Sequence, residues 1–163
     1  MSVLDIRRWP DPVLSQRCAE VGDPASVRQL AEDMLETMYA APGRGLAAPQ
    51  IGRPIRLFVM DVTWKEGVKT PLVCVNPEIV DRAGAVTSGP EGCLSIPGVT
   101  AEVPRAPWIV LRWTTPEGET REERLDGAAS ICAQHEYDHL DGIVTFDRIN
   151  PEQRAALEAE YAG

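Results

Sequence analysis

The stretch His135-Glu136-Tyr137-Asp138-His139 decides how the rest of this sequence is interpreted. On an α-helix, positions i and i+4 lie on one face about one turn apart, so both imidazoles can reach a single ion. Glu136 projects about 100° further round the helix, close enough to touch a water on that ion without being a ligand. These are the only two histidines in the chain. The spacing therefore predicts a metal-binding helix.

One face of this helix, which we expect to begin near Asp126 and to end at a glycine C-cap at Gly142, is largely apolar. That face carries Ala128, Ile131, Cys132, His135 and His139. The pattern predicts that both histidines face the protein interior. The alternative is a helix with two ordinary histidines, in the core or on the surface, and no metal.

A catalytic ion needs a third protein ligand and an open position. A histidine six residues after His139 would be one solution, but that position is Thr145. Glu158 and Glu160 are downstream carboxylates, yet they fall in a short terminal segment with too little chain left to build a second half of a site. Cys93 remains, and a thiolate suits iron(II) or zinc. Taken alone, Cys93 would be interpreted as a small buried residue.

Composition excludes several classes of protein. The chain has 163 residues, 44% of them hydrophobic, which fits one domain over residues 1–163. A net charge of −9 argues against nucleic acid as the main partner. No apolar run approaches the ~20 residues that span a bilayer, and the first twelve residues resemble no signal peptide. The four cysteines form no CxxC pair, which favours a reducing compartment. We therefore expect a cytoplasmic protein without membrane contact, with the bacterial cytosol favoured.

The order of the expected elements indicates an α+β fold. Asp23 and Pro24 begin a helix whose apolar stripe ends in the glycine-rich loop at 41–45. A turn signature at 116–118 indicates a hairpin. The expected strands are Ile55–Asp61, Leu72–Asn76, Glu78–Val86, Pro107–Thr115 and Glu119–Leu125, and a last helix runs from Asn150-Pro151 to about Tyr161.

Three segments of the chain follow one another in a characteristic order. They are Gly43-Arg44-Gly45-Leu46-Ala47-Ala48-Pro49-Gln50, Glu91-Gly92-Cys93-Leu94-Ser95 and Gln134-His135-Glu136-Tyr137-Asp138-His139-Leu140. Together they resemble the motifs of the peptide deformylases. The opening Trp9-Pro10-Asp11-Pro12-Val13-Leu14 also looks like the start of that family. The resemblance implies small antiparallel β-sheets packed around a central HExxH helix, with an N-terminal helix and a short C-terminal helix. It also implies hydrolysis of the formyl amide on the N-terminal formylmethionine of newly made polypeptides, which releases formate.

The resemblance implies a set of catalytic and metal-binding residues. Cys93, His135 and His139 would be the metal ligands. Glu136 would act as general base and then as general acid. The side-chain amide of Gln50 and the backbone N–H of Leu94 would stabilise the oxyanion. The ion in such enzymes is commonly iron(II), with zinc, nickel or cobalt able to substitute, and the residues do not choose between them. Without the resemblance, Gln50 would be interpreted as a turn residue after Pro49.

Substrate contacts are implied in the same way. The backbone at Gly45 would pair with the extended nascent peptide, and Ile131 and Cys132 would lie in the pocket for the methionine side chain. Gly43 and Gly45 are equally explained by a loop that ends a helix. Glu91 would pair with Arg105, although the residues alone suggest two solvated surface charges.

The sequence departs from the family pattern at two places. Arg44 stands where the family usually has a small aliphatic residue, and its charge either faces the substrate entrance or points to water. The C-terminal segment 151–161 is short and acidic, so ribosomal RNA should repel it. We therefore expect a transient ribosome encounter without a basic docking tail, and a monomer.

Two other functions remain open at this stage. A deformylase-like paralogue would act on another formylated or acylated amine, and Arg44 is the reason to consider it. A binding module would keep the metal for structure alone. Structural sites usually have four protein ligands, whereas Cys93, His135 and His139 supply three and would leave Glu136 without a role.

Overall fold

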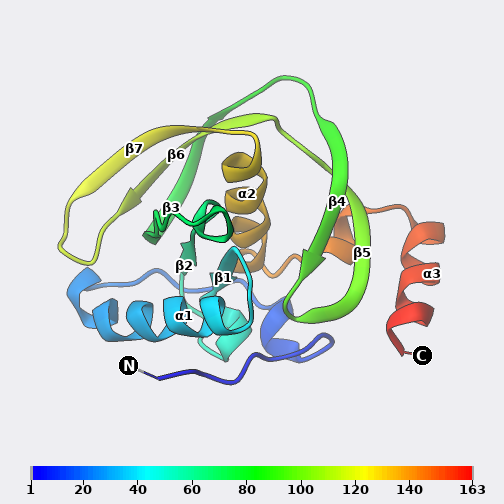
Figure 1. The fold of residues 1–163 in the computed structure, drawn as a ribbon, viewed down its shortest axis with the longest axis horizontal. Coiled ribbons are helices and arrows are strands. Elements are labelled where there is room, and N and C mark those ends of the chain that lie inside the picture. Colours follow the sequence, from blue (N-terminus) through cyan, green and yellow to red (C-terminus); the bar gives the residue numbers. More distant parts are fainter. Residues whose placement is uncertain (1, 163) are drawn as a thin grey trace.

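In the computed structural model, which describes residues 2–162, a helix near the middle of the molecule lies between two antiparallel sheets (Figure 1). The helix is α2 (Ala128–Leu140). The larger sheet has the order β1 (Gly45–Ala47), β2 (Leu57–Met60), β3 (Leu72–Arg82), β6 (Trp108–Thr114) and β7 (Thr120–Asp126). The smaller sheet is the hairpin of β4 (Thr87–Cys93) and β5 (Ile96–Arg105). The outer helices are α1 (Arg28–Ala40) and α3 (Pro151–Ala162).

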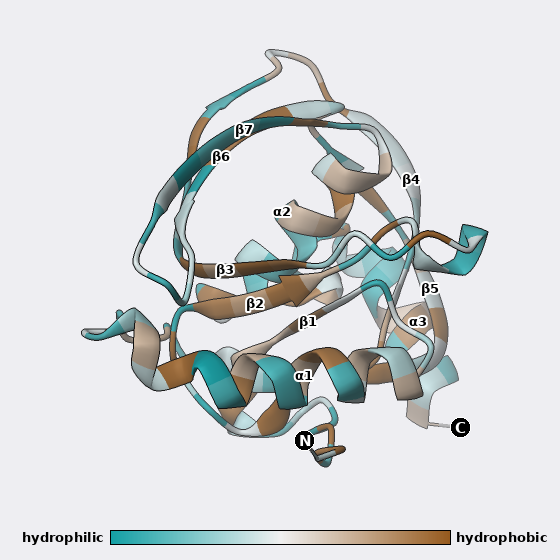
Figure 2. Cartoon of the chain, turned by 60° about the vertical axis from the view of Figure 1, so that its left-hand side comes forward, coloured by the Kyte–Doolittle hydropathy of each residue, from teal (hydrophilic) through white to brown (hydrophobic). Residues whose placement is uncertain are grey.

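The larger sheet is covered on both faces, and β2 shows why its sequence permits this. All four residues of β2 are apolar and buried. Successive side chains of a strand point to opposite faces. Leu57 and Val59 accordingly join the cluster that includes Met34 and Met38 of α1, whereas Phe58 and Met60 join the cluster that includes Ala133 and Leu140 of α2. Figure 2 shows the hydrophobic colour concentrated on β2 and β3, between the two helices. The sheet is therefore the layer that positions α2.

A third cluster supports the β4–β5 hairpin. Ile96 and Val99 of β5 pack with Leu14, Val144 and Phe146, and α3 covers this cluster from outside. The hairpin turn follows Cys93 directly. This packing fixes the turn beside α2. Within residues 2–162, no helix has the length and apolar composition needed to cross a bilayer.

The expected α+β class, the three helices and the hairpin of β6 and β7 are confirmed. Asp23 caps its helix as expected by accepting from the N–H of Ala25, but the first turn, Pro24–Val27, is a 3-10 helix. Gly142 follows the last residues of α2 at a φ of 75°, as a C-cap glycine does. Two expected strands, Leu72–Asn76 and Glu78–Val86, form one strand, β3, with a register shift between Val75 and Glu78.

The sequence did not predict β1, β4 or β5. The first is three residues long, and the hairpin is interrupted by glycine and proline, which are typical of loops. These segments pair because packing holds them beside α2 and α3.

The interpretation of α2 as a helix with one inward apolar face needs correction. Its buried residues lie all round the axis, including Gln134, Glu136 and Asp138. On the supposed core face, Ala128 is exposed, and Ile131 and Cys132 are only partly buried. The reason is that these three residues line an open groove. Both histidines are nevertheless buried, as expected.

Candidate metal centre and active site

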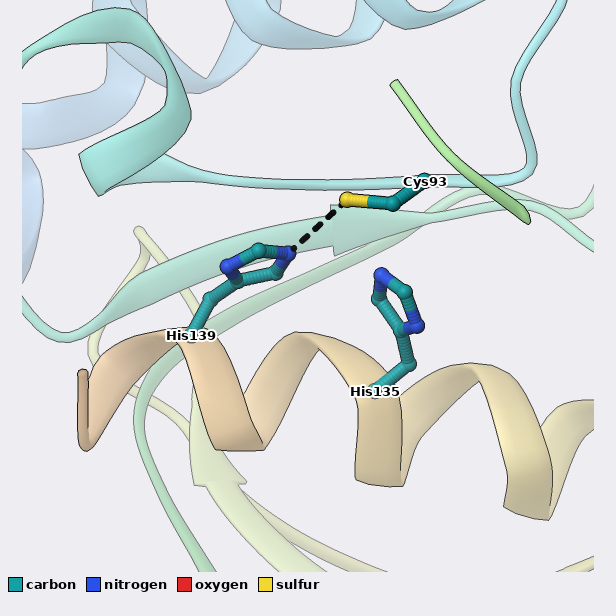
Figure 3. A group of neighbouring side chains, drawn as sticks. All are labelled: Cys93, His135 and His139. Atoms are coloured by element: carbon teal, nitrogen blue, oxygen red, sulfur yellow. Dashed lines mark hydrogen bonds between the residues drawn. The ribbon is translucent and has the colours of Figure 1, made fainter. Parts of the chain in front are cut away.

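The three expected metal ligands come together in the structure (Figure 3). His135 and His139 project from successive turns of α2, and Cys93 approaches them from the end of β4. The potential ligand atoms of these residues all lie within 4.8 Å of one another. Residues 93 and 139 are 46 positions apart, so the tertiary fold creates this cluster.

The donor set fits one transition-metal ion. At typical zinc distances, a tetrahedral site holds its sulfur and nitrogen ligands about 3.6 Å apart. Cys93 Sγ lies 3.5 Å from His139 Nε2. His135 Nδ1 lies 3.0 Å from Glu91 Oε1, which leaves Nε2 as the metal-binding atom of that ring. Three protein ligands with an open fourth position are typical of catalytic sites.

Glu91 belongs to a buried ionic chain behind His135. Arg105 donates two hydrogen bonds to Glu91, at 2.9 and 3.0 Å, so the expected pair forms, and both side chains are buried instead of solvated. Arg105 also donates to Asp138, and Asp138 accepts two further bonds from Arg148. Burial opposes the charge of Glu91, but its bonds to His135 and Arg105 hold the pKa of Glu91 below its ordinary value. Through Glu91, this ionic network fixes the orientation of the His135 ring.

The charges around the cluster shift the pKa values of the two histidines in opposite directions. Burial alone would lower the pKa of His135, but the negative neighbours Glu136, Cys93 and Glu91 raise it well above its ordinary value. Burial and the nearby positive charges of His135 and Arg105 lower the pKa of His139 well below its ordinary value. A metal binds the neutral imidazole, so His139 already has the form that a ligand needs, whereas an ion that bound His135 would displace a proton from it.

Glu136 lies beside the cluster, and among residues 2–162 its one ion-pair contact is with His135. Its Oε2 atom is 4.0 Å from His135 Nε2, and its buried Oε1 atom has no hydrogen-bond partner among residues 2–162. Burial raises the pKa of Glu136 to about 7, with His135 opposing the shift and Glu91 adding to it. A carboxyl group placed in this way is available to exchange a proton with a molecule in the groove.

Gln50 faces the cluster from the 3-10 helix Ala48–Ile51. Its Oε1 accepts from the N–H of Ala47 at 2.9 Å, and this bond distinguishes the oxygen of the amide from its nitrogen. The NH2 group therefore points the other way, donating to Ser95 Oγ at 3.0 Å and lying 3.7 Å from Cys93 Sγ. The side chain is a fixed donor aimed at the candidate metal cluster.

A groove of about 730 Å³ runs past these groups. The expected site residues that line it are Arg44, Gly45, Gln50, Cys93, Leu94, Ile131, Cys132, His135 and Glu136. His139 is buried behind them. Burial raises the pKa of the Cys132 thiol well above its ordinary value, so Cys132 is a neutral wall of the groove. The alternative ligands Glu158 and Glu160 lie on α3, where Glu158 pairs with Arg154.

Sequence reasoning missed several residues of this site. The motifs do not identify Ser95, which holds Gln50, or Asp138 and Arg148, which belong to the ionic network behind His135. The signal for Asp138 was present, because a charged residue three positions after His135 on a buried helix requires a partner. No local signal connects Ser95 to Gln50.

The comparisons agree with the geometry. A family profile described as Polypeptide deformylase matches residues 3–155. The chain belongs to the peptide deformylase family. It is 48% identical over 158 residues to a peptide deformylase of Alkalilimnicola ehrlichii, covering 96% of this chain and 88% of that one. A peptide deformylase of Rhizobium meliloti is 47% identical over 155 residues, covering 94% and 89%.

Solved peptide deformylases have the same fold. The enzyme from Thermus thermophilus superposes with a TM-score of 0.90 at 46% identity, over 98% of this chain and 94% of that one. The enzyme from Ehrlichia chaffeensis, solved in complex with actinonin, gives a TM-score of 0.92 at 36% identity, over 98% and 96%. Peptide deformylases are metal-dependent hydrolases that remove the formyl group from N-formylmethionyl peptides, and this protein is a hydrolase of that family.

Proposed function

We propose that the groove beside α2 binds the formylmethionine end of a nascent polypeptide and hydrolyses its formyl amide. The observation that carries the proposal is the convergence of three groups on one point: the Cys93, His135 and His139 cluster, the unpartnered carboxylate oxygen of Glu136, and the oriented amide of Gln50. These groups match the needs of amide hydrolysis, namely an ion, a proton carrier and an oxyanion donor.

Cys93, His135 and His139 would hold a single divalent ion, and iron(II) is our proposal for it. Iron, zinc, nickel and cobalt all accept one thiolate and two imidazoles. When bound, the ion supplies Lewis acidity to water and to the formyl carbonyl. The thiolate moderates that acidity, while Glu91 holds His135 in the ligand orientation.

Glu136 would carry the proton. Its Oε1 atom accepts the proton of the attacking water and then delivers it to the leaving nitrogen of methionine, which departs as a free amine. The carboxylate needs to reach both the water and the leaving nitrogen, and its position between the groove and His135 allows it to do so.

Gln50 and Leu94 would stabilise the oxyanion that forms on the formyl oxygen. The Nε2 atom of Gln50 is held by Ser95 and aimed past Cys93, and Leu94 is the next residue after that ligand. Donors already in place lower the barrier because no reorganisation is needed as charge develops.

The substrate would lie along β1. This strand is at the edge of the larger sheet. The carbonyl of Arg44 accepts from the N–H of Asp61, next to β2. In an antiparallel pair, residues that bond to the neighbouring strand alternate with residues whose N–H and C=O groups point away from it, so those groups of Gly45 face the open edge. An extended peptide can pair there as an added strand. Ile131 and Cys132 would then contact the methionine side chain.

The test is formate release from a short formylmethionyl peptide, with protein purified without oxygen and loaded with iron(II). Acetyl-methionyl and formyl-leucyl peptides serve as substrate controls. We expect rapid release confined to the formylmethionyl peptide, and a loss of at least about 10²-fold in kcat for Glu136→Gln, in which the proton carrier is replaced by an amide of the same shape. No formate from a protein that has bound the ion would contradict the proposal and favour another formylated amine as substrate.

We further propose that the protein works in the bacterial cytosol, as a monomer that meets nascent chains transiently at the ribosome. The support is chemical: formylated chains are present where they are made, and α3 has glutamates at 152, 158 and 160 instead of a basic surface for RNA. Salt-dependent co-sedimentation with ribosomes would contradict the transient encounter.

A further inference from the structure

The rim of the groove beside β1 carries two basic side chains, Arg44 and Lys65. Both are exposed, and neither forms an ion pair with any residue of the described range 2–162. Among the described residues, the acidic ones that line the groove are Glu91 and Glu136, and both are buried at its floor. In a chain with a net charge of −9, this rim is locally positive.

Arg44 and Lys65 lie on two segments that are hydrogen-bonded to each other, and we call this set of bonds the brace. Trp64, the neighbour of Lys65, donates from Nε1 to the carbonyl of Gly43 at 2.9 Å. The N–H of Asp61 donates to the carbonyl of Arg44 at 2.8 Å. These bonds attach the segment after β2 to the loop before β1. Arg44 and Lys65 therefore stay on the same side of the groove.

The carboxylate of Asp61 strengthens this brace. It accepts from the Tyr39 hydroxyl at 2.6 Å and from the N–H of Thr70 at 3.1 Å. The ammonium group of Lys65 lies 5.8 Å from the ring centre of Trp64, which keeps that side chain along the loop. The positive rim is thus supported at both ends of the segment that carries Lys65.

The course of an extended substrate decides what would meet this rim. Successive side chains of an extended peptide point to opposite sides. If the methionine side chain enters the groove between Ile131 and Cys132, the side chain of the following residue points out of the groove, and the one after it lies further along the rim. A charge on either residue would lie near Arg44 and Lys65, since the acids that line the groove, Glu91 and Glu136, are buried at its floor.

We propose that Arg44 and Lys65 form a specificity site for a carboxylate side chain on one of the two residues that follow formylmethionine. This inference rests on the proposed function, because it concerns the substrate of the same groove. An exposed ion pair contributes modestly, so each cation should raise kcat/KM for an acidic peptide by about two- to fivefold over its amide counterpart.

The experiment compares matched peptides with amidated C-termini, which removes their terminal charge. Formyl-Met-Asp-Ala and formyl-Met-Ala-Asp are each paired with the peptide that has Asn in place of Asp. The proteins are wild type, Arg44→Gln, Lys65→Gln and the double variant. Lys69→Gln is the control, because Lys69 lies on the same segment but its ammonium group sits 4.4 Å from the Tyr39 ring centre and does not line the groove.

We expect wild type to prefer Asp over Asn at one of the two positions, and the double variant to lose that preference while it still cleaves the Asn peptides. Lys69→Gln should keep it. Salt at 1 M, where the screening length falls to about 3 Å, should abolish the preference in wild type. Equal kcat/KM for Asp and Asn peptides in wild type, or a preference that survives in the double variant, would overturn the inference. Failure to cleave any of the four peptides would instead overturn the proposed function.

Discussion

Gly45 has little space for a side chain beside Glu136 and Cys132. A Cβ atom at this position would lie 2.6 Å from Glu136 Oε2 and 2.8 Å from Cys132 Sγ, both too close. Gly45 is not among the residues with positive φ, so its backbone does not require glycine. The close approach of Glu136 and Cys132 is what requires glycine at this position. In contrast, the three atoms nearest to an added Cβ at Gly43 would all belong to the Leu94 side chain, the closest at 2.7 Å.

We predict that Gly45→Ala lowers kcat by about 10²-fold, because the Glu136 carboxylate must shift by a good part of an ångström to admit the methyl group. Gly43→Ala is the matched control, and its effect should be at least several-fold smaller because the Leu94 side chain can rotate away. Steady-state kinetics measure the effect, and thermal unfolding shows that both variants fold. Equal losses in the two variants would refute the role given to the Gly45–Glu136 contact.

At the scale of elements, an ionic chain joins α2 to β4, β5 and the 3-10 turn Thr145–Arg148. Arg105 is 5% exposed and holds Glu91 and Asp138 together, whereas Arg148, at the outer end, is 43% exposed. Buried charges depend on their partners much more than exposed ones do. Arg105 should therefore contribute more to the stability of the fold than Arg148 does.

We predict that Arg105→Met lowers the free energy of unfolding by about 3–5 kcal/mol, since Glu91 and Asp138 lose a buried partner. Arg148→Met should cost about 1 kcal/mol or less, because that end of the chain reaches solvent. Urea unfolding of the two variants measures the difference. Similar costs would mean that burial does not govern this network.

Another element-scale feature is the brace at Asp61, between β2 and the loop that follows it. Burial opposes the charge of Asp61, but hydrogen bonds from the Tyr39 hydroxyl and from Thr70 and Thr63 hold the pKa of Asp61 below its ordinary value. A carboxyl group whose pKa is lower in the folded than in the unfolded state stabilises the fold above its unfolded pKa of about 4. That contribution is lost as the pH falls through the folded value.

We predict that Asp61→Asn lowers the free energy of unfolding by about 1–3 kcal/mol at pH 7, the usual worth of hydrogen bonds to a charged group. The difference from wild type should shrink steadily below about pH 4, because the wild-type carboxyl then becomes neutral too. Urea unfolding of both proteins between pH 3 and 7 measures this. A difference that does not change with pH would show that the charge of Asp61 contributes nothing.

At the scale of the whole molecule, the candidate metal cluster of Cys93, His135 and His139 links the two sheets through α2. Cys93 lies at the end of the β4–β5 hairpin, while His135 and His139 lie on the helix that packs against the larger sheet. An ion that binds only the folded arrangement stabilises it by mass action. The stability of the fold should therefore depend on the metal.

We predict that an ion present at 100 times its Kd raises the free energy of unfolding by about 2.7 kcal/mol, and that a chelator reverses the gain. Cys93→Ser should bind the ion more weakly and gain much less under the same conditions. Urea unfolding with and without iron(II) or zinc measures the gain independently of activity. The same gain in Cys93→Ser would place the ion elsewhere in the protein.

Local sequence was sufficient for the helices and for part of the site. The i, i+4 histidines, the Gly142 C-cap and the hairpin around residues 116–118 depend on short-range geometry, and all three are confirmed. Elimination of the other candidate ligands left Cys93, and the resemblance selected Gln50; no periodicity identifies either residue. Glycine and proline hid β4 and β5, since strand propensity is weak where tertiary pairing supplies the stability.

The sequence by itself determined the residue types that could hold a metal, the α+β class and the family. Only the tertiary structure decided which side of α2 is open, because a helix buried all round carries no periodic signal that separates groove from core. It also decided the partners of Gln50 and Asp138, and it placed Lys65 on the same rim as Arg44. These contacts join residues far apart in the chain, and their energies arise only when burial excludes water and brings the groups within hydrogen-bonding distance.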